Sequence, residues 1–170
     1  MTTTHTPKTD ESAQAVEIRV NDPSALPAFA ALNKRWIEEM HHLEESDQMM
    51  VREPAIYLEN GGKVITAHLD GEVAGAVALK YHIEGEAAGQ WELTKMAVDP
   101  AFQGRGIGQA LMDAAHRIAR EELGLSEMFL LSNTRNAAAL RLYARNGWVV
   151  NHEGPHPVYC RCNIGMRVKL

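Results

Sequence analysis

The sequence predicts one α/β domain built on a mixed β-sheet, and three observations lead to this fold class. The chain has 170 residues, 45% of them hydrophobic, which suits a single globular domain with an ordinary core. Short runs with the apolar pattern of strands alternate with segments of helical periodicity. Two of the strand patterns flank Asp70-Gly71, the strongest short signal for a hairpin turn. The order is strand, helices, hairpin, strand, helix, strand, helix, strand and strand, so we expect about seven strands and about four helices over residues 15–170.

The first half of the chain carries start and stop signals for helices between its strand patterns. Asp22 and Ser24 are typical of a helix start. Gly61 and Gly62 are typical of a helix end. The expected elements are a strand at 15–20, a helix over 21–45, a short helix beginning at Pro54, and strands at 63–69 and 72–81.

The second half alternates strands and helices. Gly124 and Gly147 each follow a helical pattern and predict its end, and Asn136 can cap the second of these helices. The expected elements are a strand at 89–98, a helix that buries Ile107, Leu111, Ala115 and Ile118, a strand at 126–132, a helix at 137–146, and closing strands at 148–150 and 158–170.

Charge and hydropathy argue against several classes of partner. Seventeen Lys and Arg residues against 22 Asp and Glu residues give a net charge of −5, which argues against broad nucleic-acid binding. Residues 1–14 have no apolar core of the kind that a signal peptide needs, and no stretch approaches the roughly 18 apolar residues of a membrane span. We therefore expect a cytoplasmic protein with no nucleic-acid or membrane partner, and a disordered tail over residues 1–14.

The two cysteines are expected to be free thiols. Only one residue separates Cys160 from Cys162, so within an extended strand they are poorly placed to form a disulfide with each other. Together with His152 and His156 they match the spacing of no standard zinc site, and no bound metal is expected.

Gly104, Gly106 and Gly108 alternate with other residues directly before a helical pattern. Glycine in a helix lowers helix stability by about 1 kcal/mol relative to alanine. Three glycines at one helix start therefore indicate that a ligand lies against the backbone, where a side chain would obstruct it. A helix start has unpaired N–H groups and the positive end of the helix dipole, so this loop predicts phosphate binding. Neither the Walker pattern nor the dinucleotide Gly-x-Gly-x-x-Gly pattern is present.

The loop does match the pattern Gln/Arg-x-x-Gly-x-Gly/Ala, over residues 103–108. In this loop the sequence resembles the GNAT superfamily of N-acetyltransferases, which bind acetyl-coenzyme A. A second match follows a strand pattern later in the chain, where the family has Asn-x-x-Ala-x-x-Leu-Tyr-x-x-x-Gly-Phe and this chain has Trp in place of Phe. The matching residues are Asn136, Ala139, Leu142, Tyr143, Gly147 and Trp148. The resemblance covers about residues 64–150 and implies the GNAT fold.

The resemblance implies a coenzyme site in two parts. Main-chain N–H groups of the loop hold the coenzyme pyrophosphate, and the pantetheine arm pairs with the main chain of the preceding strand, where one N–H can also stabilise the thioester oxygen. Asn136 contacts the coenzyme from the next helix start, although a plain N-cap explains it equally. The implied binding residues are Met96, Ala97, Val98, Gln103, Gly104, Arg105, Gly106, Ile107, Gly108 and Asn136, with Arg135 and Arg141 as further phosphate candidates.

Acetyl transfer needs a neutral amine, a base to take its proton and an acid for the leaving thiolate. The resemblance implies Glu92, six residues before Val98, as the base and Tyr143 as the acid. The alternatives are a solvated carboxylate at a strand end and a core tyrosine. A route through an acetyl-cysteine is disfavoured, because nothing near Cys160 or Cys162 marks an activated thiolate.

The acceptor is expected to be a primary amine of a small molecule or a protein, bound between the first helices and the last loop. A CoA-binding sensor or interaction domain without turnover is the alternative, and a homodimer is common in the family. The expected acceptor-binding residues are Trp36, His156 and Tyr159, with Glu39, His41, His42, His152 and Arg161 as further candidates.

Overall fold

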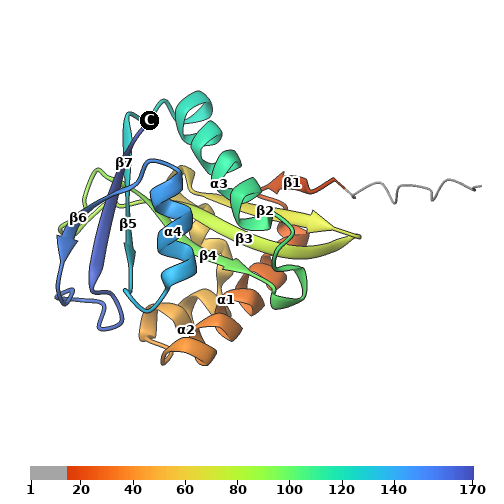
Figure 1. The fold of residues 1–170 in the computed structure, drawn as a ribbon, viewed down its shortest axis with the longest axis horizontal. Helices are drawn as coiled ribbons and strands as arrows, with labels where there is room; N and C mark the ends of the chain where they lie inside the picture. Colours follow the sequence, from red (N-terminus) through yellow and green to blue (C-terminus); the bar gives the residue numbers. More distant parts are fainter. Residues whose placement is uncertain (1–14) are drawn as a thin grey trace, which may run out of the picture.

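The computed structural model describes residues 15–170, which form a seven-stranded sheet with helices on both faces (Figure 1). The strand order is β1-β2-β3-β4-β5-β7-β6. Only β4 and β5 are parallel, and every other neighbouring pair is antiparallel. The predicted α/β class with a mixed sheet is therefore confirmed. The tail expected at residues 1–14 lies outside the described residues.

The strands are β1 (Glu17–Val20), β2 (Lys63–Leu69), β3 (Glu72–Tyr81), β4 (Trp91–Val98), β5 (Glu127–Ser132), β6 (Val149–Glu153) and β7 (Ile164–Lys169). The α-helices are α1 (Leu26–Met40), α2 (Glu45–Arg52), α3 (Ile107–Arg117) and α4 (Ala137–Arg145). Short 3-10 segments are η1 (Pro23–Ala25), η2 (Pro54–Gly61) and η3 (Pro100–Phe102), and η4 (Ile118–Glu122) is a π-helical extension of α3. No helix among residues 15–170 is long and apolar enough to cross a membrane.

The hairpin between β2 and β3 turns at the predicted position. Asp70 and Gly71 have φ angles of 55° and 77°, the left-handed pair that a two-residue hairpin turn requires. Aspartate tolerates this conformation better than most side chains, and glycine adopts it without cost.

Two apolar clusters hold helices to opposite faces of the sheet. The larger cluster joins α3 to β2, β3 and β4, with Leu111 and Ile118 fully buried. The smaller cluster lies on the other face, where Phe29 of α1, Met50 of α2 and Tyr57 of η2 cover β3. The sheet is therefore the wall between two helical layers, and each layer supplies part of the site described below.

Gly75 of β3 allows α3 to lie directly against the sheet. A Cβ at this position would lie 2.8 Å from Ile107 Cγ2 and 3.1 Å from the Ala97 carbonyl oxygen. Gly75→Ala is therefore expected to lower the free energy of unfolding by about 1–3 kcal/mol through overpacking, and Gly75→Val to lower it further. Urea denaturation of the two variants measures the effect. Equal stability of Gly75→Ala and the unaltered protein would contradict the tight packing of α3.

The long helix predicted over residues 21–45 is wrong in its extent. The structure has α1 only to Met40, and a separate helix, α2, begins at Glu45. Glu44 and Asp47 form a reciprocal capping box, in which each side chain accepts a hydrogen bond from the other's backbone N–H. Capping boxes usually begin with Ser or Thr and end with Glu or Gln. Because this one begins with Glu and ends with Asp, the sequence gave no recognisable signal for a helix start.

The closing strand predicted over residues 158–170 is also too long, because β7 begins only at Ile164. Residues 159–162 form a turn, in which the Cys162 N–H donates to the Tyr159 carbonyl over 3.0 Å. Cys160 and Cys162 therefore lie on a turn and not within an extended strand, and both are free thiols as predicted.

Candidate functional site

Strands β4 and β5 meet at one point and then separate. Their only register pair joins Glu92 to Phe129. Beyond this pair, Lys95 adopts a left-handed conformation with φ 56°, and the register between β3 and β4 shifts. Such a bulge kinks a strand. The end of β4 at Met96 and Val98 consequently has no register partner on β5, and these residues line an opening in the sheet.

A cavity of about 600 Å³ occupies this opening. It runs from the glycine loop and the start of α3, along the end of β4, to α1, η2 and the loop before β7. Most residues expected from the sequence line it. These are Trp36, Glu92, Met96, Ala97, Val98, Gln103, Gly104, Gly106, Ile107, Gly108, Asn136, Tyr143 and Tyr159.

Two residues of the expected set do not line the cavity. Arg105 is exposed on the glycine loop. His156 instead supports Tyr159: the two rings stack with centroids 5.1 Å apart, and His156 Nδ1 accepts a hydrogen bond from the Tyr159 N–H over 3.1 Å. Among the further candidates, His41 and Arg161 line the cavity, whereas Glu39, His42, Arg135, Arg141 and His152 do not.

The glycine loop presents bare backbone to the cavity. Gly104 and Gly106 have φ angles of 77° and 75°, and a Cβ on either would meet no atom within 4 Å. Gly106 is the N-cap of α3 and provides no side chain to bind the first N–H groups of the helix. The loop therefore leaves both the space and the donors that an anion at a helix start requires.

Glu92 lies where β4 and β5 still pair. It is 9% exposed, and its Oε2 lies 2.7 Å from Nε2 of His82, the residue that directly follows β3. A carboxylate only accepts hydrogen bonds, so His82 donates to it from Nε2. The arrangement holds one carboxylate oxygen in place and leaves the group on the cavity wall.

Tyr143 reaches the cavity from α4. The residue is 7% exposed, and burial raises the pKa of its phenol to about 12. Its ring packs against Trp148, with centroids 6.2 Å apart. Tyr143 therefore belongs to the apolar core and also lines the cavity, so the two interpretations open at the sequence level are compatible.

Two buried polar atoms facing this region have no hydrogen-bond partner among the described residues. They are Asn136 Oδ1 and His41 Nε2. Asn136 stands at the N-cap of α4 but makes no capping bond, and its Nδ2 lies 3.5 Å from Ser132 Oγ. Burial, followed by the charge of Arg161, lowers the pKa of His41. The Asn136 side chain also raises the pKa of His41, so the two side chains lie close together, and either a ligand or a hydrogen bond between them can satisfy these atoms.

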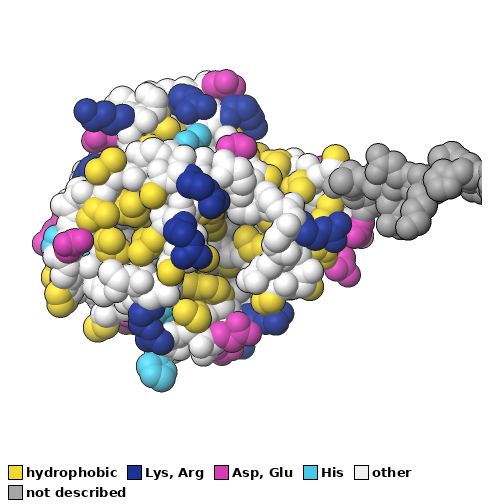
Figure 2. Space-filling model, in the orientation of Figure 1, with side chains coloured by type: hydrophobic (Ala, Val, Ile, Leu, Met, Phe, Trp, Pro, Cys, Tyr) yellow, Lys and Arg dark blue, Asp and Glu magenta, His cyan; other side chains and the backbone are white. Residues whose placement is uncertain are grey.

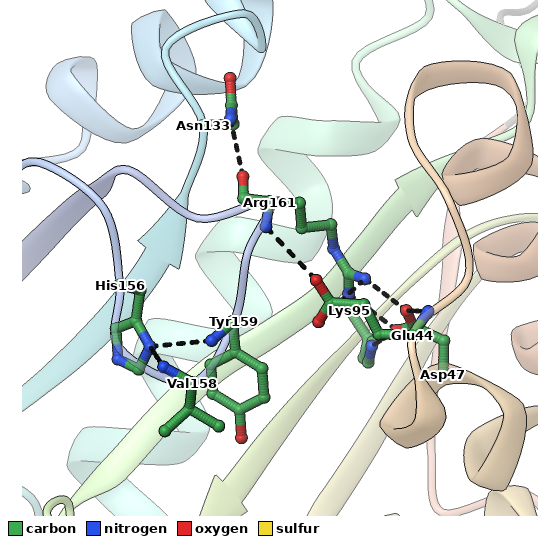
Figure 3. A network of polar contacts seen from close by, with 8 residues as sticks. All are labelled: Glu44, Asp47, Lys95, Asn133, His156, Val158, Tyr159 and Arg161. Atoms are coloured by element: carbon green, nitrogen blue, oxygen red, sulfur yellow. Dashed lines mark hydrogen bonds and ion pairs between the residues drawn. The ribbon is translucent and has the colours of Figure 1, made fainter.

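A buried ionic network lies beside the cavity, and two of its members, Lys95 and Arg161, line it (Figure 3). Asp47 is fully buried; its Oδ1 accepts from Lys95 Nζ over 2.6 Å and from an Arg161 guanidinium nitrogen over 2.7 Å, while Oδ2 contacts the other guanidinium nitrogen. The Arg161 N–H also donates to Glu44 Oε1 over 3.3 Å. Burial alone would raise the pKa of Asp47, but the hydrogen bonds from Arg161 and Lys95 outweigh it and hold the pKa at about 2.

Sequence reasoning named Arg161 but missed its partners in this network, and it missed several other lining residues, among them Tyr57 and Lys80. One signal was present, because Lys95 interrupts an otherwise apolar strand end. The partners gave none, since 48 residues separate Asp47 from Lys95 and 114 separate it from Arg161.

Comparison with known proteins identifies the architecture. Residues 28–148 match the family described as Acetyltransferase (GNAT) family. The chain belongs to the GNAT acetyltransferase family. The match covers the glycine loop, the splayed strands and α4, so the GNAT resemblance predicted from the sequence is confirmed.

The curated relatives are matched over only part of their own length. The chain is 29% identical over 108 residues to a mycothiol acetyltransferase of Acidimicrobium ferrooxidans, covering 63% of this chain and 34% of the relative. It is 27% identical over 125 residues to a mycothiol acetyltransferase of Salinispora tropica, covering 71% of this chain and 40% of the relative. The match therefore spans well under half the length of these curated proteins.

Solved structures share the GNAT fold at low sequence identity. A GNAT-family acetyltransferase from Staphylococcus aureus superposes with a TM-score of 0.76 at 20% identity, covering 92% of this chain and 99% of that one. A PaiA N-acetyltransferase from Thermoplasma acidophilum, solved with coenzyme A, gives 0.67 at 19% identity, with coverage of 92% and 99%. A spermidine N-acetyltransferase from Vibrio cholerae, solved with CoA and spermine, gives 0.67 at 18% identity, with coverage of 91% and 95%.

Proposed function

We propose that the protein transfers an acetyl group from acetyl-CoA to a primary amine by direct attack. The observation that carries this proposal is that the glycine loop, the free main chain of β4, Glu92 and Tyr143 all line one cavity. Family membership supports the same reaction class.

The residues present fit the proposed coenzyme. The open glycines and the start of α3 suit the pyrophosphate. The end of β4 offers main-chain groups to the amide-containing pantetheine arm, which would pair there like an added strand. Asn136 has an unpartnered oxygen for a pantetheine N–H. Lys and Arg side chains stand over the face that carries α4, where Arg145 lines the cavity (Figure 2).

The chemistry follows from the placement of these groups. As the amine nitrogen bonds to the thioester carbon, negative charge grows on the carbonyl oxygen, and a main-chain N–H at the end of β4 stabilises it. The amine, which is mostly protonated at neutral pH, loses one proton before it attacks, and Glu92 accepts this proton directly or through a water molecule; it loses a second proton as the amide forms. The carbon–sulfur bond then breaks, and the products are the acetylated amine and the free thiol of CoA.

Tyr143 is proposed to interact with the sulfur atom that leaves the thioester. With a pKa of about 12 its phenol keeps its proton at neutral pH and can donate a hydrogen bond to the departing sulfur. A phenol is a weaker acid than a thiol, whose usual pKa is about 8.5. Tyr143 therefore stabilises the thiolate mainly as a hydrogen-bond donor, and the second proton, which the nitrogen loses as the amide forms, protonates the sulfur so that CoA leaves as the free thiol.

The thiol of Cys162 favours direct transfer over an acetyl-cysteine route. Cys162 lines the cavity, and burial raises the pKa of its thiol to about 11. The thiolate is the nucleophilic form, so Cys162 is almost entirely unreactive thiol at neutral pH.

A free-thiol assay with acetyl-CoA and a panel of primary amines tests the proposed function. We expect amine-dependent thiol release, and we expect Tyr143→Phe to lower kcat by about tenfold to a hundredfold because one charge-stabilising donor is lost. Calorimetric binding of CoA to both proteins is the control, since the phenylalanine variant keeps the coenzyme cavity.

The outcomes separate the proposal from its alternative. Failure to bind CoA would overturn the coenzyme site. Binding of CoA without thiol release for any amine would instead support a non-catalytic sensor or interaction domain, and that domain would be indifferent to Tyr143→Phe.

A further inference from the structure

Lys80 and Glu92 face each other across two neighbouring strands. Lys80 of β3 is the register partner of Glu92 of β4. Directly opposed residues in an antiparallel pair have Cβ atoms about 5 Å apart on the same face of the sheet. Both residues line the cavity, so an ammonium and a carboxylate are presented to it side by side.

These two charges do not neutralise each other. The Glu92 carboxylate is held by His82. Lys80 Nζ lies 5.8 Å from the centre of the Tyr57 ring, and it makes no ion pair with any carboxylate among residues 15–170. The ammonium over the ring is in a favourable cation–π position but retains its capacity to bind an anion.

The other charges of this wall are already balanced. Asp47 and Glu44 contribute two negative charges, and Lys95 and Arg161 contribute two positive charges, within one bonded network. Apart from this network and Arg145 of α4, the Lys, Arg, Asp and Glu residues that line the cavity are Glu92 and Lys80.

We propose that the acceptor carries a carboxylate next to its primary amine, as a free amino acid does. This inference rests on the proposed function. Lys80 binds the acceptor carboxylate, and Glu92 takes the proton of the neighbouring amine. Trp36, Tyr57 and Tyr159 also line the cavity and offer apolar contact to the acceptor side chain. A polyamine fits less well, because its second ammonium would meet Lys80 without an opposing charge.

The test compares the free amino acids with their C-terminal amides and with spermidine, using the thiol-release assay. We expect higher kcat/KM for one or more free amino acids than for the matching amide. Lys80→Met is expected to raise KM for that amino acid by about tenfold to a hundredfold with little change in kcat, because a charge-assisted contact is lost. The amide should be unaffected, and Lys80→Arg should restore most of the affinity. Lys169→Met, on the exposed end of β7, is the matched control.

Equal kcat/KM for acids and amides, or an equal loss for both in Lys80→Met, would overturn the inference. A binding measurement separates it from the proposed function. Calorimetry of amino-acid binding to the CoA-loaded protein, with and without Lys80→Met, reports the carboxylate site without turnover. Lys80-dependent binding without any acetyl transfer would support the site and reject the reaction, and absence of both would reject the two together.

Discussion

Glutamine in place of Glu92 is expected to lower kcat for amine acetylation by about a hundredfold to ten-thousandfold, the range for loss of a general base. The amide cannot take a proton at neutral pH, yet it matches the carboxylate in size and keeps an oxygen for the hydrogen bond from His82 Nε2. The fold and the coenzyme cavity should therefore persist. Steady-state kinetics with a saturating amine measure the loss.

The pH dependence of Glu92→Gln gives the sharper result. An amine with a pKa of about 10.4 is mostly protonated at neutral pH and needs a base, but it sheds its own proton as the pH approaches that value. The difference in kcat between Glu92→Gln and the unaltered protein should therefore become smaller as pH rises. Glu72→Gln, an exposed carboxylate at the start of β3, is the control and should behave as the unaltered protein. A pH-independent deficit, or no deficit, would remove Glu92 from the role of base.

Asparagine in place of Asp47 is expected to lower the free energy of unfolding by about 3–5 kcal/mol. Asp47 is fully buried, and the substitution leaves the charges of Lys95 and Arg161 in the interior without their shared carboxylate. Urea denaturation at pH 7 measures the loss. Asp113→Asn, on the exposed face of α3, should change stability by less than about 0.5 kcal/mol.

The same carboxylate predicts an acid-sensitive stability. The pKa of Asp47 falls from 3.8 to about 2 on folding, so the folded state favours the ionised form. A depressed carboxyl pKa stabilises the protein above the unfolded value and loses that contribution as pH falls toward the folded one. At about 1.4 kcal/mol per pKa unit, roughly 2 kcal/mol should disappear between about pH 5 and pH 2. The free energy of unfolding of Asp47→Asn should not show this loss at low pH. Identical pH profiles of stability for the two proteins would contradict the pairing of Asp47 with Lys95 and Arg161.

Local patterns were sufficient to predict the mixed sheet, the hairpin and the glycine loop that lines the cavity. Asp70-Gly71 and the glycines of residues 103–108 act through their own backbone angles, so their signals lie in adjacent residues. Glu92 and Tyr143 were located by position in a family pattern, and the structure brings both to one cavity.

The contacts made by α2 and by the loop before β7 could not be predicted in the same way. The start of α2 depends on a capping box of two acidic residues, and Asp47 gains its role only from partners far along the chain. The turn at residues 159–162 is stabilised by His156 and by Glu44, and neither contact follows from strand periodicity. Tertiary contacts override local propensity at such positions.

The single pairing between β4 and β5 makes Glu92 a pivot. Each residue of a strand adds about 3.3 Å, so the end of β4 at Val98 lies roughly 20 Å along the strand from the point where the sheet is still closed. Any change in the angle between the two parts of the sheet moves the open end most and the pivot least. Under the proposed function, the opening between β4 and β5 would therefore adjust its width around a pantetheine arm, while the Glu92 carboxylate proposed as the base would keep its position.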